Sequence, residues 1–264
     1  MATLDLSSPL AKLNRAYEHL DALHEQTIAF YAGELTDGPP YVINSEFRAD
    51  SSQYVFTIKT LNEPPPLLGL ILGDFAHNLR SALDHLVCQL ARLTDPTCDC
   101  TTTEYPICWS SARFKERENS LLKGVRREHR AIIEEHQPYT AGEKADDHFL
   151  SILHWLDNVD KHRFVHPTFG YMVDMGFEAA RAVRFIPNAD AGPIRGHSFA
   201  RGRRIEGDTD IAWLTIEPTG PNPKVEMHGE PSFEPAIGDL WLRARVLPEL
   251  VESVKSIIAL FAAG

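Results

Sequence analysis

Four histidines supply the groups best suited to acid–base chemistry: His77, His85, His154 and His162. The first two lie within residues 67–92 and the other two within residues 143–164, and both stretches have helical periodicity. Imidazole titrates near neutrality, so it can take up or release a proton at physiological pH. The first question is therefore which other side chains share a helix face with these histidines.

Residues 67–92 predict one long helix with two different faces. Its apolar stripe consists of Leu72, Phe75, Leu79, Ala82, Leu83, Leu86 and Leu90. The opposite face carries Asp74, His77, Asn78, Arg80, Ser81, Asp84, His85 and Cys88. That face contains no Lys and no Glu, the residues that normally solvate a helix exterior. It is more typical of a side that faces a site, a partner helix or a second subunit than bulk water.

Residues 143–164 predict a second helix of the same kind. Its apolar stripe is Phe149, Ile152, Leu153, Leu156 and Val159. Opposite it lie Asp147, Ser151, His154 and Asn158, followed one turn on by Lys161 and His162. Asp74, Asn78, Ser81 and His85 have the same offsets on the first helix. We expect the two polar stripes to face each other, either as one site or as a satisfied polar network or dimer interface.

Two motifs resemble those of an uncharacterised bacterial family. These are GDFAHNLRSALDHL in the first helix and NVDKHR in the second, with QPY upstream of the latter. The resemblance spans about residues 10–166. It carries no activity, but it implies that the two polar faces form one site. The second motif adds Asn158, Asp160, Lys161, His162 and Arg163 to the candidate binding or catalytic residues.

A second resemblance is to HEPN domains, helical bundles that often act as metal-independent ribonucleases. Their motif is an Arg followed four to six residues later by His, and the segment from Arg80 to His85 has this spacing. The resemblance implies that Arg80 holds the scissile phosphate and that His85 handles the proton of the attacking 2′-hydroxyl. HEPN domains usually have Asn, Asp or His after the Arg, whereas this chain has Ser81. HEPN sites are composite, so the resemblance also implies a homodimer.

Metal binding is the alternative chemistry. Asp74 and His77, and likewise His154 and Asp157, are spaced i, i+3, so that each pair shares one helix face. With His162 they form the alternative metal-ligand set. Bundle metal sites usually use Glu rather than Asp, so no cofactor is favoured and a divalent metal remains the alternative.

The four cysteines have the spacing C-x9-C-x-C-x7-C, which is not a zinc pattern. We expect reduced, independent thiols. No apolar run is long enough to span a membrane and the first residues do not resemble a signal peptide, so we expect a cytoplasmic protein.

The net charge of −11 argues against non-specific binding to DNA or to anionic membranes. It leaves room for local binding of an anionic ligand or RNA. Two basic regions could serve one: Lys123, Arg126, Arg127 and Arg130, and Arg195, His197, Arg201, Arg203 and Arg204. The usual structure of such regions is a solvated surface.

The rest of the chain predicts an α+β fold. We expect a helix at 9–33, a β-hairpin at 41–48 and 53–60, and helical segments from 110 to 136 broken near Gly124. Beyond residue 166, β-like runs are expected at 171–177, 182–186, 197–201, 211–216 and 224–228. A helix at 238–262, kinked or split at Pro248, closes the chain. The expected organisation is a helical bundle with its hairpin at 1–166, and an antiparallel β region with the last helix packing on the bundle at 167–264. One continuous domain is the alternative.

Three functions follow from these features. The first is HEPN-like, metal-independent RNA cleavage or nucleotide binding, with Arg80, His85, His77, Asp84 and Lys161 as catalytic candidates. The second is a metal-assisted small-molecule hydrolase or binder with its site between the two helices. The third is a non-catalytic dimeric interaction module.

Overall fold

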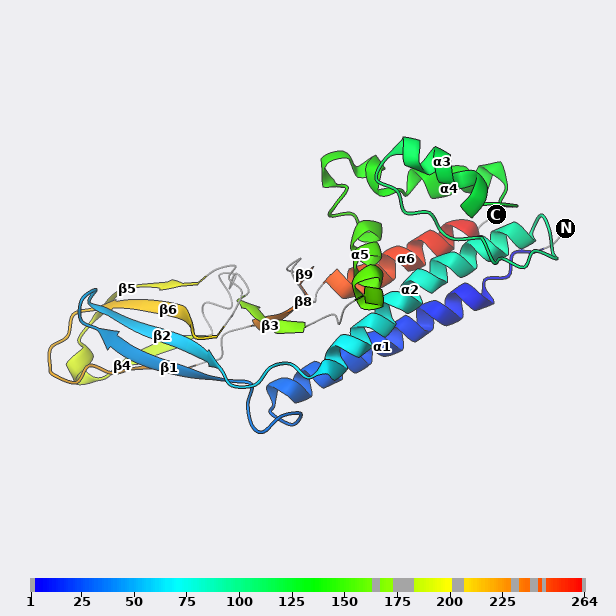
Figure 1. Cartoon of the computed structure of the whole chain (residues 1–264). Coiled ribbons are helices and arrows are strands. Elements are labelled where there is room, and N and C mark those ends of the chain that lie inside the picture. The colour runs from blue at the N-terminus through cyan, green and yellow to red at the C-terminus, as the bar shows by residue number, and fades with distance from the viewer. Residues whose placement is uncertain are drawn as a thin grey trace. The chain divides into compact units, whose positions relative to one another are not determined.

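The computed structural model (Figure 1) describes residues 3–162, 167–172, 183–200, 207–228, 233–237, 242–243 and 246–262. The fold is α+β, as predicted. The chain forms two compact units, one comprising residues 1–25, 66–165 and 245–264, and the other residues 26–65 and 166–244. The first unit contains most of the helices and the second contains the strands. This division differs from the expected order of 1–166 and 167–264, because the hairpin groups with the later strands.

The helices run in the following order along the chain. They are α1 (Ser7–Tyr31), α2 (Pro66–Arg92), α3 (Ser111–Leu121), α4 (Arg127–Glu135), the 3-10 helix η1 (Pro138–Lys144), α5 (Phe149–His162) and α6 (Val246–Ala262). Helix α2 contacts both α5 and α6. Its predicted apolar stripe is confirmed, since all seven of its residues are at most 1% exposed. Burial of these aliphatic and aromatic side chains stabilises the helical unit.

Helix α5 differs from its prediction in two ways. It begins at Phe149 rather than at residue 143, because the chain up to Lys144 forms η1, in which Gly142 has a positive φ of +60° that an α-helix does not allow. Its buried side is shifted as well. Leu150, Leu153, Leu156 and Asp157 are buried, whereas the expected stripe residues Phe149, Ile152 and Val159 are half-buried.

A glycine and a proline determine where the helices end or begin in two other predicted helical regions. Gly124 adopts φ +79° and separates α3 from α4, as predicted. The predicted kink at Pro248 is wrong, because α6 begins at Val246 and places Pro248 in its first turn. There the missing N–H breaks no intrahelical hydrogen bond. Residues 242–243, expected in the helix, form strand β9 instead.

The second unit contains antiparallel strands. They are β1 (Tyr41–Arg48), β2 (Gln53–Thr60), β3 (Pro167–Met172), β4 (Arg184–Pro187), β5 (Ile194–Phe199), β6 (Thr209–Ile216), β7 (Val225–His228), β8 (Phe233–Ile237) and β9 (Leu242–Arg243), with a short 3-10 helix η2 (Ala189–Ala191) after β4. The larger sheet has the order β1-β2-β6-β5, and smaller ladders join β3-β8-β9 and β4-β7. Of the run expected at 171–177, residues 173–177 lie outside the described residues.

The predicted hairpin is confirmed with its bounds. Strand β2 is an interior strand, because it pairs with β1 on one side and with β6 on the other. Tyr54, Val55, Phe56 and Ile58 are therefore buried. No helix in the described part of the chain is long and apolar enough to cross a membrane.

Candidate functional site

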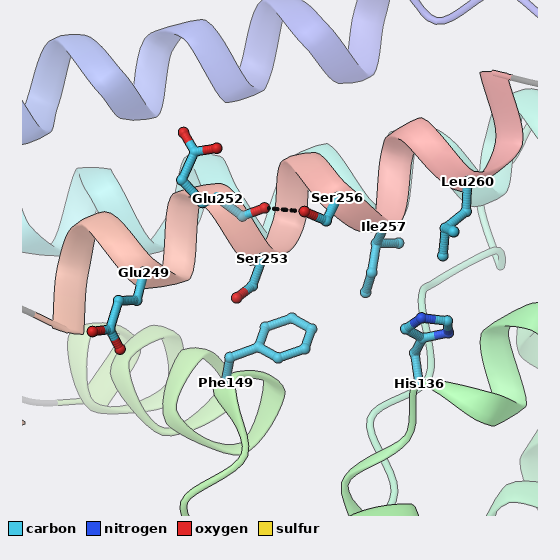
Figure 2. A pocket seen from close by; sticks show the side chains of 8 residues that line it. All are labelled: His136, Phe149, Glu249, Glu252, Ser253, Ser256, Ile257 and Leu260. Carbon is cyan, nitrogen blue, oxygen red and sulfur yellow. Dashed lines mark hydrogen bonds between the residues drawn. The ribbon is translucent and has the colours of Figure 1, made fainter.

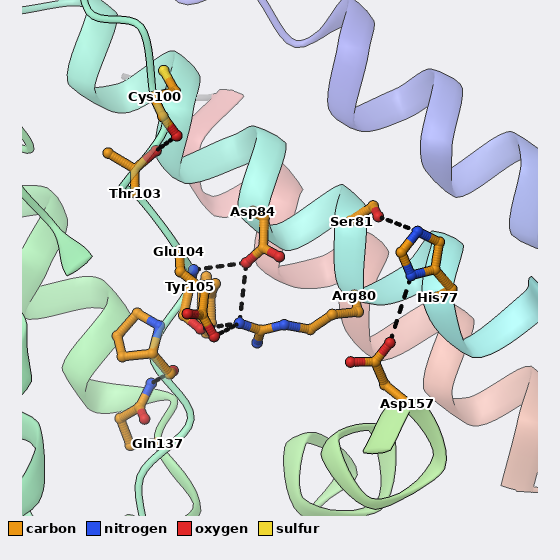
Figure 3. Close-up of polar contacts among 11 residues, drawn as sticks. His77, Arg80, Ser81, Asp84, Cys100, Thr103, Glu104, Tyr105, Gln137 and Asp157 are labelled. Atoms are coloured by element: carbon orange, nitrogen blue, oxygen red, sulfur yellow. Dashed lines mark hydrogen bonds and ion pairs between the residues drawn. The ribbon is translucent and has the colours of Figure 1, made fainter. Parts of the chain in front are cut away.

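Arg80 joins α2 to the segment that follows it (Figure 3). Its Nη2 atom donates hydrogen bonds to Glu104 Oε1 at 2.6 Å and to the Tyr105 carbonyl oxygen at 2.8 Å. The same nitrogen lies 3.1 Å from Asp84 Oδ1, one helical turn on. The Arg80 side chain is 7% exposed, and within the described part of the chain its buried Nη1 atom makes no hydrogen bond. One cation thus holds two carboxylates and fixes residues 104–105 against α2.

Asp84 is the carboxyl group of this cluster whose pKa is clearly raised. Its Oδ1 atom accepts a hydrogen bond from the Tyr105 amide at 2.8 Å. Burial raises the pKa of Asp84 to about 6, although Arg80 and the Tyr105 amide oppose the shift. The charges of Glu104 and Asp157 raise it further. A carboxyl group with such a pKa can exchange a proton near neutral pH.

His77 lies between a hydroxyl and a carboxylate (Figure 3). Its Nε2 atom is 3.4 Å from Ser81 Oγ, and its Nδ1 atom is 3.7 Å from Asp157 Oδ1 on α5. Asp157 is 3% exposed, whereas the side chain of His77 is 57% exposed. The hydroxyl therefore lies at Nε2 and the buried carboxylate at Nδ1. This is the arrangement in which a histidine base activates a serine nucleophile while a carboxylate orients its ring. The distances exceed those of strong hydrogen bonds, as is common before substrate binds.

The other edge of the polar face contacts α1. His85 Nδ1 lies 2.6 Å from Ser8 Oγ, and Lys12 Nζ donates to Asn78 Oδ1 at 3.4 Å. Burial, with a smaller contribution from the Lys12 charge, lowers the pKa of His85. Asn78 Nδ2 also donates to the carbonyl oxygen of Asp74 at 2.8 Å.

The polar face of α2 is therefore divided between two neighbours. Arg80, Asp84 and His77 lie toward α5 and residues 104–105, whereas His85 and Asn78 lie toward α1. The structure does not bring Arg80 and His85, the pair implied by the HEPN resemblance, to a common neighbour.

The expected polar stripe of α5 does not face α2 as a whole. Ser151 is buried and donates to the carbonyl oxygen of Ala145 at 2.7 Å. His154 Nε2 lies 2.7 Å from Asn158 Nδ2, and its ring packs edge-on against Trp109 with centroids 5.1 Å apart. Asp147 is exposed and precedes the helix. The expectation of two matching stripes fails because the buried side of α5 is shifted, and Asp157 is the residue that reaches His77.

The end of α5 carries several more predicted residues. Asp160, Lys161 and His162 belong to its last turn, but their side chains are outside the described part of the structure. Arg163 lies outside the described residues altogether.

The alternative metal ligands are only partly assembled. His77 and Asp157 approach each other, while His154 bonds to Asn158. Within the described ranges, no group of three or more His, Cys, Asp and Glu side chains is arranged to hold a metal ion. The side chain of His162 is not among those described.

The expectation of four independent thiols is wrong. Cys88 on α2 and Cys100 in the following segment form a disulfide, with Cα atoms 5.4 Å apart. Cys98 and Cys108 are free, the former half-buried and the latter buried. The disulfide forms because the turns after α2 fold the chain back onto the helix, which the spacing of the cysteines does not reveal.

One arginine of each basic region has well-defined partners. Arg130 donates to the carbonyl oxygens of Val125 and Leu122 at 2.9 and 2.8 Å, so it closes the α3–α4 connection. Arg195 forms an exposed ion pair with Glu217 at 2.8 Å. Also in the second region, His197 lies in β5 with its ring 5.6 Å from that of Phe199. Three further members fall outside the described residues: Arg201, Arg203 and Arg204.

A pocket of about 460 Å³ opens at a separate place in the helical unit (Figure 2). It is lined by His136 after α4, Phe149 at the start of α5, and one face of α6: Glu249, Glu252, Ser253, Ser256, Ile257 and Leu260. None of the predicted site residues lines it. His136 Nδ1 donates to the Ile132 carbonyl oxygen at 2.8 Å. The pocket is therefore distinct from the polar groups of α2.

Two contributors to the site were not predicted from the sequence. Glu104 and Tyr105 lie in an irregular segment with no periodicity, and nothing in their spacing connects them to Arg80. The one available signal is chemical, because a buried Arg requires carboxylate or carbonyl partners. That rule predicts that partners exist without saying which residues they are.

Comparison of the chain with family models, with curated proteins and with solved structures gave no match.

Proposed function

We propose that the face of α2 toward α5 is a metal-independent hydrolytic site that acts on acyl esters. The observation that carries the proposal is the series of Ser81 Oγ, the His77 ring and the Asp157 carboxylate, with separations of 3.4 and 3.7 Å. His77 is exposed enough to meet a substrate, whereas Asp157 is buried enough to be a fixed orienting group.

In this mechanism His77 is the general base. Its Nε2 atom accepts the proton of the Ser81 hydroxyl as Oγ attacks the acyl carbonyl carbon. The imidazolium then returns the proton to the departing alkoxide, and the same base activates the water that releases the acyl group. Asp157 is a positioning residue that holds Nδ1 protonated and the ring oriented. The Arg80 cluster holds the adjoining turn of α2 in place through residues 104–105.

The proposal is tested with a fluorophosphonate probe, which forms an Oγ–phosphorus bond with an activated serine as fluoride leaves. We expect labelling of the intact protein at Ser81, found by peptide mapping, and hydrolysis of short-chain nitrophenyl esters. Both should be lost in Ser81→Ala and fall at least about 100-fold in His77→Ala, in line with the usual contribution of a general base. Asp157→Asn should lower kcat and shift its pH profile without abolishing binding.

The chain offers a matched control. Ser8 and His85 form a second serine–histidine pair, with a separation of 2.6 Å, on the other edge of α2. His85→Ala should leave labelling and ester hydrolysis unchanged. No labelling of the wild type, or labelling at Ser8 that His85→Ala removes, would overturn the proposal.

RNA cleavage of the HEPN type is the second candidate. It is favoured by a buried guanidinium whose Nη1 atom has no hydrogen-bond partner within the described part of the chain. The mechanism requires Arg80 to hold a phosphate while His85 handles the proton of the 2′-hydroxyl. Cleavage of single-stranded RNA that is lost in His85→Ala and kept in His77→Ala would select this function. Cleavage that is kept in His85→Ala and lost in His77→Ala would instead assign the RNA cleavage to the site around His77.

A further inference from the structure

Three sulfur atoms lie together at the end of α2. Cys88 and Cys100 form the disulfide, and Cys98 Sγ lies 3.9 Å from Cys100 Sγ. Cys98 is half-buried and not disulfide-bonded. The fourth cysteine, Cys108, is buried and its backbone amide is bonded to Gln137 at 2.9 Å. A free thiol near van der Waals contact with a disulfide sulfur is the arrangement from which thiol–disulfide exchange begins.

Local hydrogen bonds hold the free thiol in this place. Arg92 Nε donates to the Cys98 carbonyl oxygen at 3.2 Å, and the Cys98 amide donates to the Asp95 carbonyl oxygen at 3.0 Å. Asp95 in turn accepts from the amide and hydroxyl of Thr97. The position of Cys98 relative to α2 is therefore fixed by the turns that follow the helix and by Arg92 within it.

Cys100 is held in an unfavourable backbone conformation. Its φ is +58°, in the left-handed region that a residue with a Cβ atom rarely adopts. Thr103 Oγ1 donates to its carbonyl oxygen at 3.1 Å, and its sulfur is bound to Cys88. These constraints place Cys100 Sγ between two possible partners, one on the helix and one two residues earlier in the chain. Cα atoms two residues apart lie at most about 7.3 Å from each other, so only a small adjustment of the turn is needed to reach the separation of about 4.4–6.8 Å that a Cys98–Cys100 disulfide spans.

We propose that Cys88, Cys98 and Cys100 form a thiol–disulfide exchange site. The Cys98 thiolate attacks Cys100 Sγ, a Cys98–Cys100 bond forms, and the Cys88–Cys100 bond breaks. The electron pair leaves on Cys88 Sγ, which then takes a proton from solvent. One disulfide and one thiol are present before and after the step, so no external oxidant or reductant is needed. An external dithiol can next reduce the Cys98–Cys100 disulfide, and Cys100 is then free of α2.

The exchange acts on the segment that carries Glu104 and Tyr105. Cys100 lies four residues before Glu104 and is linked to it through the Thr103 turn (Figure 3). In the Cys88–Cys100 state the segment is attached to α2 both by the disulfide and by the contacts of Arg80 and Asp84. In the Cys98–Cys100 state the covalent attachment is gone, and the hydrogen bonds and ion pairs of Arg80, Asp84 and Arg92 remain. The reaction partner of this site is therefore a thiol compound that reduces the Cys98–Cys100 disulfide. This role is independent of the reaction proposed at His77.

The test maps disulfides in the full-length protein. The protein is equilibrated without reductant at pH 8.5, quenched in acid, alkylated and digested under non-reducing conditions. We expect two species. In one, two peptides are joined by Cys88–Cys100 and Cys98 is alkylated; in the other, a single peptide holds an internal Cys98–Cys100 disulfide and Cys88 is alkylated. Cys98→Ser should contain the first cross-link alone, and the control Cys108→Ala should behave as the wild type. A wild type alkylated at Cys98 and never at Cys88, or one with no disulfide, would overturn the proposal.

A rate measurement gives independent support. Because the exchanged disulfide lies in the loop, a small dithiol should reduce the wild type at least about five-fold faster than Cys98→Ser, since access governs exchange rates. Cys108→Ala, which removes the buried thiol without introducing a hydroxyl group, should match the wild type. Equal rates for the wild type and Cys98→Ser would contradict a role for Cys98 as the internal nucleophile.

Discussion

A buried guanidinium is stable only while its charge and its donors face partners. Arg80 is 7% exposed and bonds to Glu104 and to the Tyr105 carbonyl oxygen. Replacing Arg80 by Met keeps the volume of the stem but leaves the carboxylates of Asp84 and Glu104 close together without the cation. Because both carboxylates keep some access to water, we expect a loss of about 2–3 kcal/mol in the free energy of unfolding. Urea denaturation of the two proteins at pH 7 measures the difference.

The chain contains a control for this substitution. Arg113 forms an i, i+3 ion pair with Glu116 at 2.7 Å on the exposed side of α3. Arg113→Met should change the free energy of unfolding by no more than about 0.5 kcal/mol, because exposed pairs contribute little. Equal effects of the two substitutions would show that the Arg80 cluster does not hold the fold together.

The raised pKa of Asp84 makes a prediction about pH. Burial disfavours its charged form, so the folded pKa is about 6 against an ordinary value of 3.8. The folded protein therefore binds more protons than the unfolded chain between these values, and stability falls as the pH rises through this window. Relative to Asp84→Asn, the wild type should lose about 1–2 kcal/mol between pH 4 and pH 7, after allowance for partial exposure. Denaturation curves at pH 4, 5.5 and 7 test this, and a constant difference would contradict it.

At the scale of single elements, the disulfide stabilises the segment between α2 and α3. The bond closes a short loop, since Cys88 and Cys100 are 12 residues apart. Loops of this length gain about 3 kcal/mol from cross-linking in the chain-entropy model, so Cys100→Ser should lose about 2–3 kcal/mol. Exchange of the Tyr105 amide hydrogen, which is bonded to Asp84, should also become faster. Cys108→Ser is unsuitable as a stability control because Cys108 is buried, so Cys98→Ser serves instead and should keep slow exchange.

Elements with strong local patterns were predictable from the sequence. The apolar spacing of α2 fixes which side is buried, and the two β-type runs with their turn give β1 and β2 with their bounds. The prediction of which side of α5 is buried was wrong, because it did not include Leu150 and Asp157 among the buried residues. Strand β9 was missed because two residues pair with β8 through Ala236 and Ile237, a contact that no local pattern carries.

At the scale of the whole chain, long-range pairing decided what could be predicted. Strand β2 becomes an interior strand by pairing with β6, so that Gln53 lies opposite Thr215. The candidate site depends on the same kind of information. His77, Arg80, Ser81 and Asp84 were found from their spacing on one helix. Glu104 comes from an irregular segment and Asp157 from another helix, so their positions depend on tertiary packing.

The pairing of β2 with β6 also brings a charged pair together from distant parts of the chain. Arg48 Nη1 lies 2.6 Å from Asp210 Oδ2, and Thr57 Oγ1 donates to Asp210 Oδ1 at 2.7 Å. The hydrogen bond from Arg48, and then that from Thr57, lower the pKa of Asp210.

The stability that Asp210 contributes is therefore present above its ordinary pKa of 3.8 and is lost as the pH falls through the lower folded value. Asp210→Asn should cost about 1 kcal/mol at pH 7 and less at pH 3, a dependence opposite in sign to that of Asp84. Glu217→Gln, which removes an exposed pair with Arg195, should leave the stability unchanged at both values. Urea denaturation of the three proteins measures this, and an Asp210→Asn effect that persists undiminished in acid would mean that packing rather than charge holds β6 against β2.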